Sequence, residues 1–264
     1  MSLDRIALFL LVLISLNLRS QRLAIMGAMD EEIAILTDSL KNKKELTKGG
    51  VTFYKGKLKG KKVIILKAGI GKVNAAYSTA ILLDNFKVEG LIFTGVAGGL
   101  DPEIKPGDIV IGENLVQYDF GELKNDTFET WPTRNLIKNN ARSPLFLPVD
   151  KNLLALSTQA SASVTLAPIE GHIPKFYVGT IVTGDTFVSD ASKAKNLYTD
   201  FNALATEMEG AAVAQVSTML GVPFIVIRSC SDNANSNAHT DYFKFVKIAS
   251  VNSAQLVLAI LERY

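Results

Sequence analysis

The chain has 264 residues, of which 48% are hydrophobic and 20% are charged, a composition typical of a folded globular protein and unlike that of a disordered chain. Its single cysteine, Cys230, excludes an intrachain disulfide and a cysteine-rich zinc site, and two histidines are too few for a histidine-built metal centre. The net charge of +2 is too small to indicate nucleic-acid binding. From the charge we therefore expect no nucleic acid as a partner, and from the cysteine and histidine counts we expect no metal.

Residues 1–20 are predicted to be a signal-like hydrophobic leader, which leaves residues 21–264 as one folded domain. Residues 6–16 are almost entirely apolar, and this run is shorter than the roughly 20 residues that span a bilayer. With Arg5 in front of it, the run fits the hydrophobic region of a signal peptide. We therefore favour export or membrane tethering, and an extra buried helix in a cytoplasmic protein is the alternative.

The domain is predicted to begin with a strand, a helix and a hairpin. Residues 22–28 have the pattern of a buried strand that ends in glycine, and residues 30–40 follow with helical spacing. The first turn of this helix is acidic, which suits a helix N-terminus. Residues 51–58 and 62–68 then form a hairpin joined by Lys59-Gly60-Lys61.

Lysines are concentrated in residues 41–62, where they greatly outnumber the one acid, Glu45. The favoured interpretation is a lysine-edged hairpin whose charges are solvated, because edge strands commonly carry Lys to block pairing. A patch that binds a polyanion is the alternative. The lysines are Lys41, Lys43, Lys44, Lys48, Lys55, Lys57, Lys59, Lys61 and Lys62.

Strand and helix signals alternate through the rest of the chain, apart from residues 121–150, which are predicted as a long loop. The alternation indicates one three-layer α/β domain with a mixed central sheet flanked by helices. In such sheets, ligands lie beyond the carboxyl ends of the strands. The other predicted elements are strands at 89–95, 108–113, 176–183, 203–208 and 223–229, and helices from Gly69 and Gly71 to about 86 and at 150–160, 209–220 and 243–263.

The turn Gly69-Ile70-Gly71, between a strand and a helix, has part of the dinucleotide-binding fingerprint. Asn74 stands where the third glycine of that fingerprint is expected, so a tight turn into a helix is the favoured interpretation. Cys230 follows an apolar strand and is predicted to be a packed small side chain rather than a nucleophile. We therefore expect no cofactor.

Carboxylates follow three of the predicted strands. Glu32 lies just past the first strand, Glu209 follows the strand at 203–208, and Asp232 follows the strand at 223–229. If these strands share a parallel sheet, the three side chains converge at its carboxyl edge. Acids without histidine partners suggest acid–base chemistry on a neutral, polyhydroxylated substrate such as a glycoside. Solvated loop acids and helix caps are the alternative.

Six short motifs occur in order along the chain, and together they are far more specific than any one alone. They are Gly27-Ala28-Met29-Asp30-Glu31-Glu32, Ala68-Gly69-Ile70-Gly71-Lys72-Val73-Asn74-Ala75-Ala76, Thr94-Gly95-Val96-Ala97-Gly98-Gly99, Gly184-Asp185-Thr186-Phe187, Glu207-Met208-Glu209-Gly210-Ala211-Ala212 and Arg228-Ser229-Cys230-Ser231-Asp232. In these motifs the chain resembles the 5′-methylthioadenosine/S-adenosylhomocysteine nucleosidases, over roughly residues 21–120 and 173–262.

This resemblance implies the nucleoside phosphorylase fold, a homodimer, and hydrolysis of the bond between ribose and adenine. By resemblance, Asp232 is the general acid that protonates adenine N7, Glu32 activates the attacking water, and Glu209 holds the ribose hydroxyls. A carboxylate at Glu32 would repel phosphate, which favours water over phosphorolysis. The other implied substrate contacts are Ser231, which orients the acid, Met208 against the sugar, Phe187 and Val188 at adenine, and Met29, Ile70 and Arg228 near the ribose and the water.

Two pocket positions depart from the family pattern: Val96, where these nucleosidases often carry Ser, and Tyr242, where Phe is usual in the closing loop. Residues 121–150 and 160–172 do not match well, and they fall where the family builds part of the 5′-substituent pocket from the partner subunit. The preference between the two substrates therefore stays open. A surface adhesion or polyanion-binding protein on a nucleosidase scaffold is kept as a second hypothesis, because of the leader and the lysines of residues 41–62.

Overall fold

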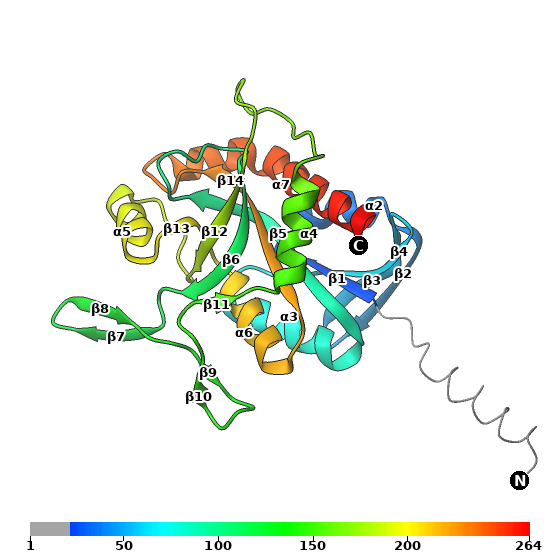
Figure 1. The fold of residues 1–264 in the computed structure, drawn as a ribbon, viewed down its shortest axis with the longest axis horizontal. Coiled ribbons are helices and arrows are strands. Elements are labelled where there is room, and N and C mark those ends of the chain that lie inside the picture. Colours follow the sequence, from blue (N-terminus) through cyan, green and yellow to red (C-terminus); the bar gives the residue numbers. More distant parts are fainter. Residues whose placement is uncertain (1–21) are drawn as a thin grey trace, which may run out of the picture.

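A computed structural model describes residues 22–264, and its fold is shown in Figure 1. The predicted leader lies outside the described residues. The helices are α2 (Asp30–Asp38), α3 (Lys72–Asn85), α4 (Lys151–Ser161), α5 (Ala191–Phe201), α6 (Gly210–Leu220) and α7 (Ala238–Arg263). The strands are β1 (Arg22–Gly27), β2 (Lys41–Lys48), β3 (Val51–Leu58), β4 (Lys61–Lys67), β5 (Val88–Gly99), β6 (Ile109–Gln117), β7 (Gly121–Lys124), β8 (Thr127–Thr130), β9 (Arg134–Asn135), β10 (Ala141–Arg142), β11 (Leu147–Pro148), β12 (Phe176–Thr183), β13 (Ala203–Glu207) and β14 (Phe224–Asp232).

Ten strands form one mixed sheet, in the order β11-β6-β12-β13-β5-β1-β4-β3-β2, with β14 paired to both β5 and β6. β14 runs parallel to β5 and antiparallel to β6, while β13 joins β12 to β5. Because β6 also pairs with β12, the strands β6, β12, β13, β5 and β14 close into a ring. The strands β1, β4, β3 and β2 extend from β5 as an open wing. This central mixed sheet with flanking helices confirms the predicted α/β fold.

The helices pack in two groups (Figure 1). α7 packs against β14 and β5 and contacts α2 and α4, whereas α3 packs against α6. By length and composition α7 could cross a membrane, but much of its apolar surface, including Leu256 and Ile260, is buried in the core. Cys230, on β14, is fully buried, and burial raises its pKa well above the ordinary value. The prediction of a packed small side chain is therefore confirmed.

The lysine-rich segment forms the outer part of the wing. β2 is the last strand in the sheet order, and its four lysines are exposed, which confirms a lysine-edged structure. The predicted hairpin of β3 and β4 is also present, and β2 adds a third antiparallel strand to it. Two-residue turns join these strands at Gly49-Gly50 and Lys59-Gly60, where both central residues have positive φ, the geometry that favours Gly in such hairpins.

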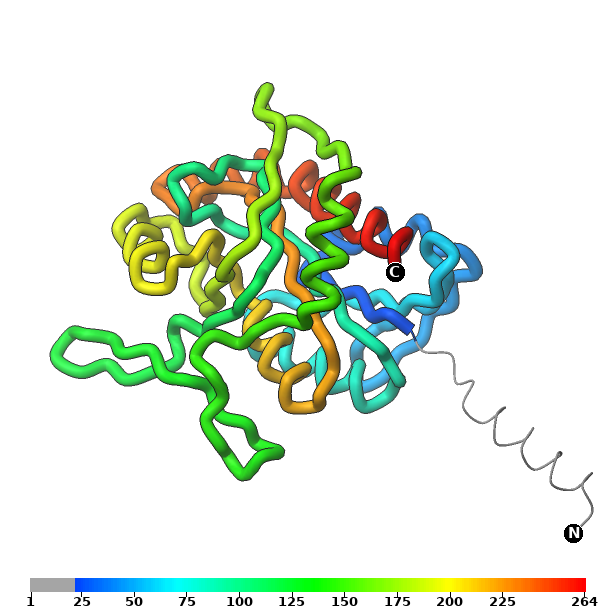
Figure 2. The backbone as a smooth tube through the Cα atoms, in the orientation of Figure 1, coloured from blue at the N-terminus to red at the C-terminus, as the bar shows by residue number. Residues whose placement is uncertain are grey.

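The prediction of a long loop at residues 121–150 is wrong. This region contains two small hairpins, β7–β8 and β9–β10, and the strand β11. The turn between β7 and β8 is Asn125-Asp126, with φ of 49° and 59°, a two-residue hairpin turn. The flanking side chains are mostly exposed and do not alternate in polarity, so the strands lack the pattern by which sequence reveals them. We call residues 119–146 the arm; Figure 2 shows it projecting from the rest of the molecule.

Two helices also differ from the prediction. α5 was not predicted; its N-terminus is capped by Asp190, whose carboxylate accepts a hydrogen bond from the backbone N–H of Lys193 at 2.7 Å. α7 begins at Ala238 rather than at residue 243, which places His239 and Tyr242 on its first turns. The earlier start matters because both side chains line the cavity described next.

Candidate active site

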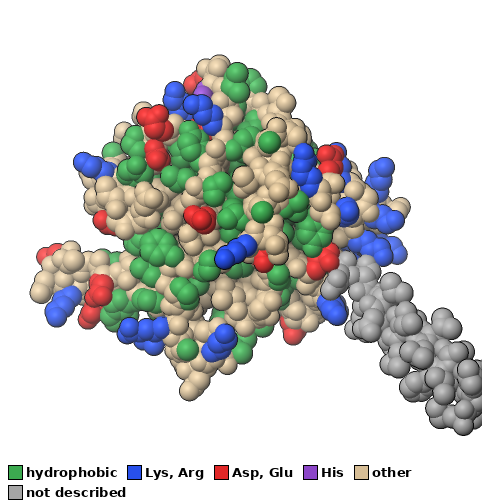
Figure 3. All heavy atoms as spheres, in the orientation of Figure 1, with side chains coloured by type: hydrophobic (Ala, Val, Ile, Leu, Met, Phe, Trp, Pro, Cys, Tyr) green, Lys and Arg blue, Asp and Glu red, His purple; other side chains and the backbone are tan. Residues whose placement is uncertain are grey.

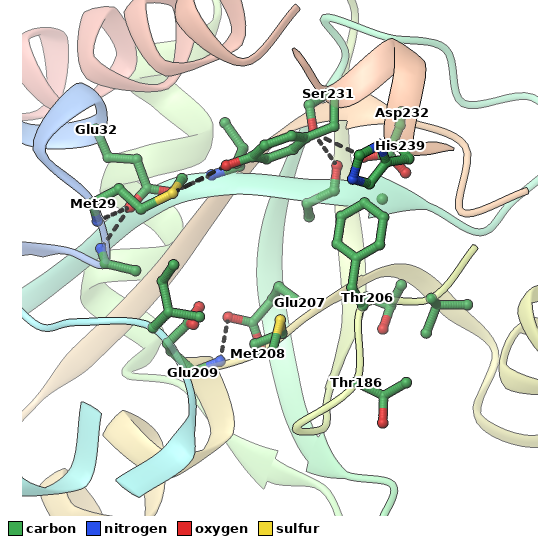
Figure 4. A pocket seen from close by; sticks show the side chains of 18 of the residues that line it. Met29, Glu32, Thr186, Thr206, Glu207, Met208, Glu209, Ser231, Asp232 and His239 are labelled. Atoms are coloured by element: carbon green, nitrogen blue, oxygen red, sulfur yellow. Dashed lines mark hydrogen bonds between the residues drawn. The ribbon is translucent and has the colours of Figure 1, made fainter. Parts of the chain in front are cut away.

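A cavity of about 350 Å³ lies where β1, β13 and β14 end and α7 begins (Figure 4). It is the place where the sheet topology predicts a ligand, beyond the carboxyl ends of strands. The carboxylates Glu32, Glu209 and Asp232 all line it, although β13 runs antiparallel to β5, so the parallel sheet on which their convergence was predicted does not include β13. The full lining is Ala28, Met29, Glu32, Ile70, Val96, Ala97, Gly98, Thr186, Phe187, Val188, Thr206, Glu207, Met208, Glu209, Ser231, Asp232, His239, Tyr242 and Phe243.

Glu32 is held rigidly in the first turn of α2. Its Oε2 accepts hydrogen bonds from the backbone N–H groups of Ala28 at 2.5 Å and Met29 at 2.9 Å, and its Oε1 accepts one from the N–H of Val96 at 2.9 Å. Burial raises the pKa of Glu32 above its ordinary value, although the charge of Arg228 and the three backbone donors oppose this. The carboxyl is therefore fixed by backbone groups rather than by a flexible side-chain partner.

Glu207, which lines the cavity, forms a buried ion pair with Arg228, which lies behind the cavity wall. The Arg228 guanidinium donates to Glu207 Oε2 from Nε at 3.2 Å and from Nη2 at 2.5 Å, and Nη2 lies 3.9 Å from Glu209 Oε2. A Cβ at Gly95 would collide with both Glu32 and Arg228, so only glycine allows these two charged groups to approach β5 so closely. The ion pair thus lies within reach of two of the cavity's carboxylates.

Glu209 connects the cavity to the start of α3. Its Oε1 accepts a hydrogen bond from the backbone N–H of Gly71 at 2.8 Å, at the N-terminus of that helix. Burial, together with the neighbouring charge of Glu207, raises the pKa of Glu209 to about 8. The Gly69-Ile70-Gly71 segment is the predicted tight turn into a helix, with positive φ at both glycines. It therefore supplies a backbone donor to the site.

One ion pair and two hydrogen bonds from backbone N–H groups to carboxylates form a ring that fixes the same helix start. Lys72 Nζ lies 2.5 Å from Asp119 Oδ1, and the backbone N–H of Lys72 donates to Asp185 Oδ1 at 2.8 Å. The ring closes through the backbone N–H of Asp185, which donates to Asp119 Oδ2 at 2.9 Å. Because Lys72 follows Gly71 directly, these contacts hold the Gly71 N–H in place for Glu209.

Asp232 is the last residue of β14 and is almost completely buried. Its Oδ2 accepts a hydrogen bond from the Ser231 hydroxyl at 2.9 Å, and its Oδ1 accepts one from the Ala234 N–H at 2.8 Å. Both bonds favour the ionised form, but burial outweighs them and raises the pKa of Asp232 to about 6. Asp232 can therefore hold a proton near neutral pH, at a point where it faces the cavity.

Aromatic side chains cover one side of the cavity. Phe187 meets Tyr242 edge to face with ring centroids 5.8 Å apart, and it meets His239 at 6.2 Å. The Tyr242 hydroxyl donates to Met29 Sδ at 3.1 Å, which joins α7 to the turn before α2. Phe187 is still 40% exposed, so part of its surface is free for a flat ligand.

All but one of the residues predicted for the site line this cavity. The exception is Arg228, which is 1% exposed and acts through its contacts with Glu207 and Glu209. His239 and Phe243 were not predicted, because neither lies in one of the six motifs. Glu207 was noted only as a neighbour of Met208, since nothing local reveals its ion pair. The other unselected lining residues are Ala28, Ala97, Gly98, Thr186 and Thr206.

The arrangement offers a buried proton donor, two further carboxylates and an apolar aromatic face. Such a set suits the cleavage of a bond that leaves positive charge on one fragment, because carboxylates stabilise a cation and the donor protonates the departing group. Within residues 22–264, no cluster of three or more His, Cys, Asp or Glu side chains has the arrangement of a metal site.

Comparison with known proteins gives consistent matches over nearly all of the described chain. The sequence model of the Phosphorylase superfamily matches residues 22–262. The 5′-methylthioadenosine/S-adenosylhomocysteine nucleosidase of Halalkalibacterium halodurans is 37% identical over an alignment of 252 residues, and the match covers 92% of this chain and 98% of that protein.

Solved structures are similar in fold as well as in sequence. The crystal structure of the same-named nucleosidase from Neisseria meningitidis, in complex with methylthio-immucillin-A, superimposes with a TM-score of 0.79 at 32% identity, covering 92% of this chain and 100% of the other. The nucleosidase from Colwellia psychrerythraea, in complex with adenine, has a TM-score of 0.79 at 35% identity, covering 92% of this chain and 95% of the other.

Proposed function

This chain belongs to the 5′-methylthioadenosine/S-adenosylhomocysteine nucleosidases of the phosphorylase superfamily, and we propose that it hydrolyses the N-glycosidic bond of both nucleosides in the cavity described above. The products are adenine and either methylthioribose or S-ribosylhomocysteine. Hydrolysis is favoured over the alternative of a polyanion-binding protein on this scaffold, because the similar proteins are named as nucleosidases.

The observation that carries this function is the buried Asp232 carboxyl, whose pKa of about 6 leaves it partly protonated near neutral pH. Adenine leaves poorly as a bare anion. Asp232 donates its proton to adenine N7, so that the base departs as a neutral molecule. The Ser231 hydroxyl, 2.9 Å from Oδ2, orients the carboxyl for this transfer.

Positive charge develops on the ribose as the bond breaks. In its ionised form, which its pKa of about 8 makes the minor form at neutral pH, Glu209 receives the ribose hydroxyls through charge-assisted hydrogen bonds that strengthen as the sugar becomes cationic. Met208 packs against the sugar. Arg228 acts from behind the wall by holding Glu207 and lying near Glu209, so it is a positioning residue rather than a substrate contact.

Glu32 activates the attacking water on the other side of the sugar. Its raised pKa makes it a better proton acceptor than an ordinary Glu, and its backbone donors keep it aimed. Met29, Ile70 and Val96 border this region, and Val96 offers only its backbone. A carboxylate here repels phosphate, so water rather than phosphate is the nucleophile.

Phe187 stacks on adenine, and the backbone of Val188 reads the edge of the base. Tyr242 closes the cavity from α7, held there by its hydrogen bond to Met29. These contacts hold the adenine base in one orientation in the cavity. No metal or cofactor is needed for any of these steps.

The test is adenine release from 5′-methylthioadenosine and S-adenosylhomocysteine, with and without inorganic phosphate and with a chelator. For each nucleoside, the rate of adenine release should be the same with phosphate, without phosphate and with the chelator. Asp232→Asn keeps the shape of the side chain without the donatable proton, so turnover should fall at least about 100-fold in a folded protein. Dependence on phosphate, or near-normal turnover of Asp232→Asn, would reject this mechanism.

We also propose that the protein is a homodimer and that the arm contacts the partner. The arm exposes Leu123, Leu136 and Ile137 at 69%, 74% and 61%, an unusual apolar surface for a monomer. Light scattering should give twice the chain mass, and Leu136→Asp with Ile137→Asp should halve it. Leu220→Asp, at an exposed apolar position outside the arm, is the control and should leave the mass unchanged.

We propose further that residues 1–20 serve as an export or membrane-tethering leader and that residues 21–264 are the nucleosidase domain. The first residue of β1 and of the family match is Arg22, which is consistent with this division. Cell fractionation with intact-mass measurement tests it. A full-length chain found only in the cytosol would reject it.

A further inference from the structure

A row of basic side chains crosses the wing at the end where the described chain begins. Lys41 on β2 lies opposite Lys57 on β3, and Lys57 lies opposite Lys62 on β4. β1 runs parallel to β4 with Leu23 beside Val63, so Arg22 stands next to Lys62. We call Lys41, Lys57, Lys62 and Arg22 the basic row. Residues opposite one another on neighbouring strands present their side chains to the same face, so the row forms one continuous charged strip.

Edge protection does not explain this row. Lysines on an edge strand block unwanted pairing, and this accounts for β2. β3 and β4, however, are inner strands of the sheet order, and they carry Lys57 and Lys62. A second pair, Lys44 and Lys55, lies across β2 and β3 beside the row. Like charges directly opposite one another on neighbouring strands destabilise a sheet. These facing lysines therefore lower the stability of the wing, and a merely solvated surface would not need them in facing positions.

Acidic side chains do not neutralise the strip. Among residues 22–264, the only lysine of segment 41–62 that forms an ion pair is Lys59, which lies 2.6 Å from Glu262. Lys41, Lys57 and Lys62 are exposed and have no such partner within this range. Figure 3 shows Lys and Arg side chains gathered on the side of the molecule where the described chain begins. The strip is therefore free to meet an external anion.

The position of the basic row, close in sequence to the apolar run, indicates which kind of anion it binds. Only five residues separate the apolar run at residues 6–16 from residue 22, a distance of roughly 20 Å when fully extended. A short apolar segment alone binds membranes weakly and reversibly, and stable attachment needs a second signal such as a basic patch. Basic residues supply that signal on anionic lipid surfaces. A linear, exposed strip also suits a flat surface better than an enclosed ligand.

We propose that the basic row, with Lys44, is a docking surface for an anionic lipid bilayer. The apolar run would provide the second attachment. Docking there leaves the active site accessible, because Arg22 begins β1 whereas Met29 and the cavity lie beyond its other end. The inference does not depend on the proposed catalytic function, since the row shares no residue with the cavity.

The test compares binding of the full chain to phosphatidylcholine vesicles and to vesicles in which a third of the lipid is phosphatidylglycerol. The wild-type protein should prefer the anionic vesicles, and added salt should weaken that preference. The triple variant Lys41→Gln, Lys57→Gln, Lys62→Gln should lose roughly 100-fold in its partition onto anionic vesicles, with no change on neutral ones.

A matched triple variant, Lys151→Gln, Lys195→Gln, Lys247→Gln, removes three exposed lysines elsewhere and should retain the preference. Both triple variants should release adenine at the wild-type rate, which shows that they are folded. Equal losses in the two variants, or no preference of the wild type for anionic lipid, would overturn the proposal. Retention on heparin that depends on the basic row, without a preference for anionic vesicles, would overturn it in favour of a soluble polyanion.

Discussion

The raised pKa of Asp232 makes the stability of the empty enzyme depend on pH, and Asp232→Asn should remove a defined part of that dependence. Burial raises the pKa of this carboxyl from 3.8 to about 6. A group whose pKa is higher in the folded state binds more protons there, so it contributes stability below its unfolded pKa and loses it as the pH rises through the folded pKa. The window for Asp232 is therefore about pH 4 to 7.

The magnitude follows from the protonated fraction. With a pKa of about 6, the folded carboxyl is roughly nine-tenths protonated at pH 5 and one-tenth at pH 7, whereas the unfolded one is ionised throughout. Integrating this difference between pH 5 and pH 7 gives a loss of about 1.4 kcal/mol in the free energy of unfolding. Asn cannot titrate, so the variant should lose about 1.4 kcal/mol less than the wild type over the same interval.

Urea unfolding at pH 5, 6 and 7 measures the effect as a difference of differences, which cancels the contributions of all other titrating groups. Asp200→Asn, at an exposed carboxylate on α5, is the matched control and should follow the wild-type slope. If Asp232→Asn and the wild type lose the same stability between pH 5 and pH 7, then Asp232 does not retain a proton in this range, and the proposed acid must be sought elsewhere.

The remaining predictions concern the contacts around Glu209. Glu209→Gln should lower the single-turnover rate more than it weakens substrate binding, because its hydrogen bonds strengthen with the charge on the sugar; an unchanged rate would leave Glu209 as a structural residue only. Arg228→Met should cost about 3–5 kcal/mol in urea unfolding, because Glu207 is left buried without its cation, and a loss below about 1 kcal/mol would contradict the burial argument. Lys72→Met should loosen the Gly71 N–H and raise the pKa of Glu209, so kcat/KM should fall at pH 7 and recover as the pH is raised. Lys72→Arg should restore normal behaviour, and a deficit independent of pH would refute this positioning role.

The catalytic constellation could be predicted because its members follow strand ends in short, ordered motifs. Glu32, Glu209 and Asp232 meet at one cavity, but the parallel sheet assumed for them holds only for β1 and β14, because β13 runs antiparallel to β5. The Glu207–Arg228 pair was out of reach, since it joins two strands through a contact that no local pattern encodes. Because the pair is buried, Arg228 contacts Glu207 behind the cavity and does not line the cavity itself.

The helix α5, which was not predicted, does have a local signal in the sequence. Apolar residues in α5 recur at Ala194, Leu197, Tyr198 and Phe201, the spacing of an amphipathic helix, and Asp190 precedes it as a cap. The sequence of the arm contains a weaker signal, because the hairpins expose their side chains and only the turn Asn125-Asp126 is typical of a hairpin. Short strands without a buried face leave no periodicity in the sequence.

The closure of β6, β12, β13, β5 and β14 into a ring has a consequence for how the molecule opens. A strand within a closed ring cannot detach without breaking hydrogen bonds on both of its sides, so the amide protons of β5 and β14 should exchange with solvent only through global unfolding. The hairpins of the arm and the edge strand β2 are each paired on one side only, and their amides should exchange through small local openings. Proteases should therefore cut first in the arm. In a nicked but still folded chain, the carboxylates at the ends of β13 and β14 should stay in place, because the ring that carries them is untouched.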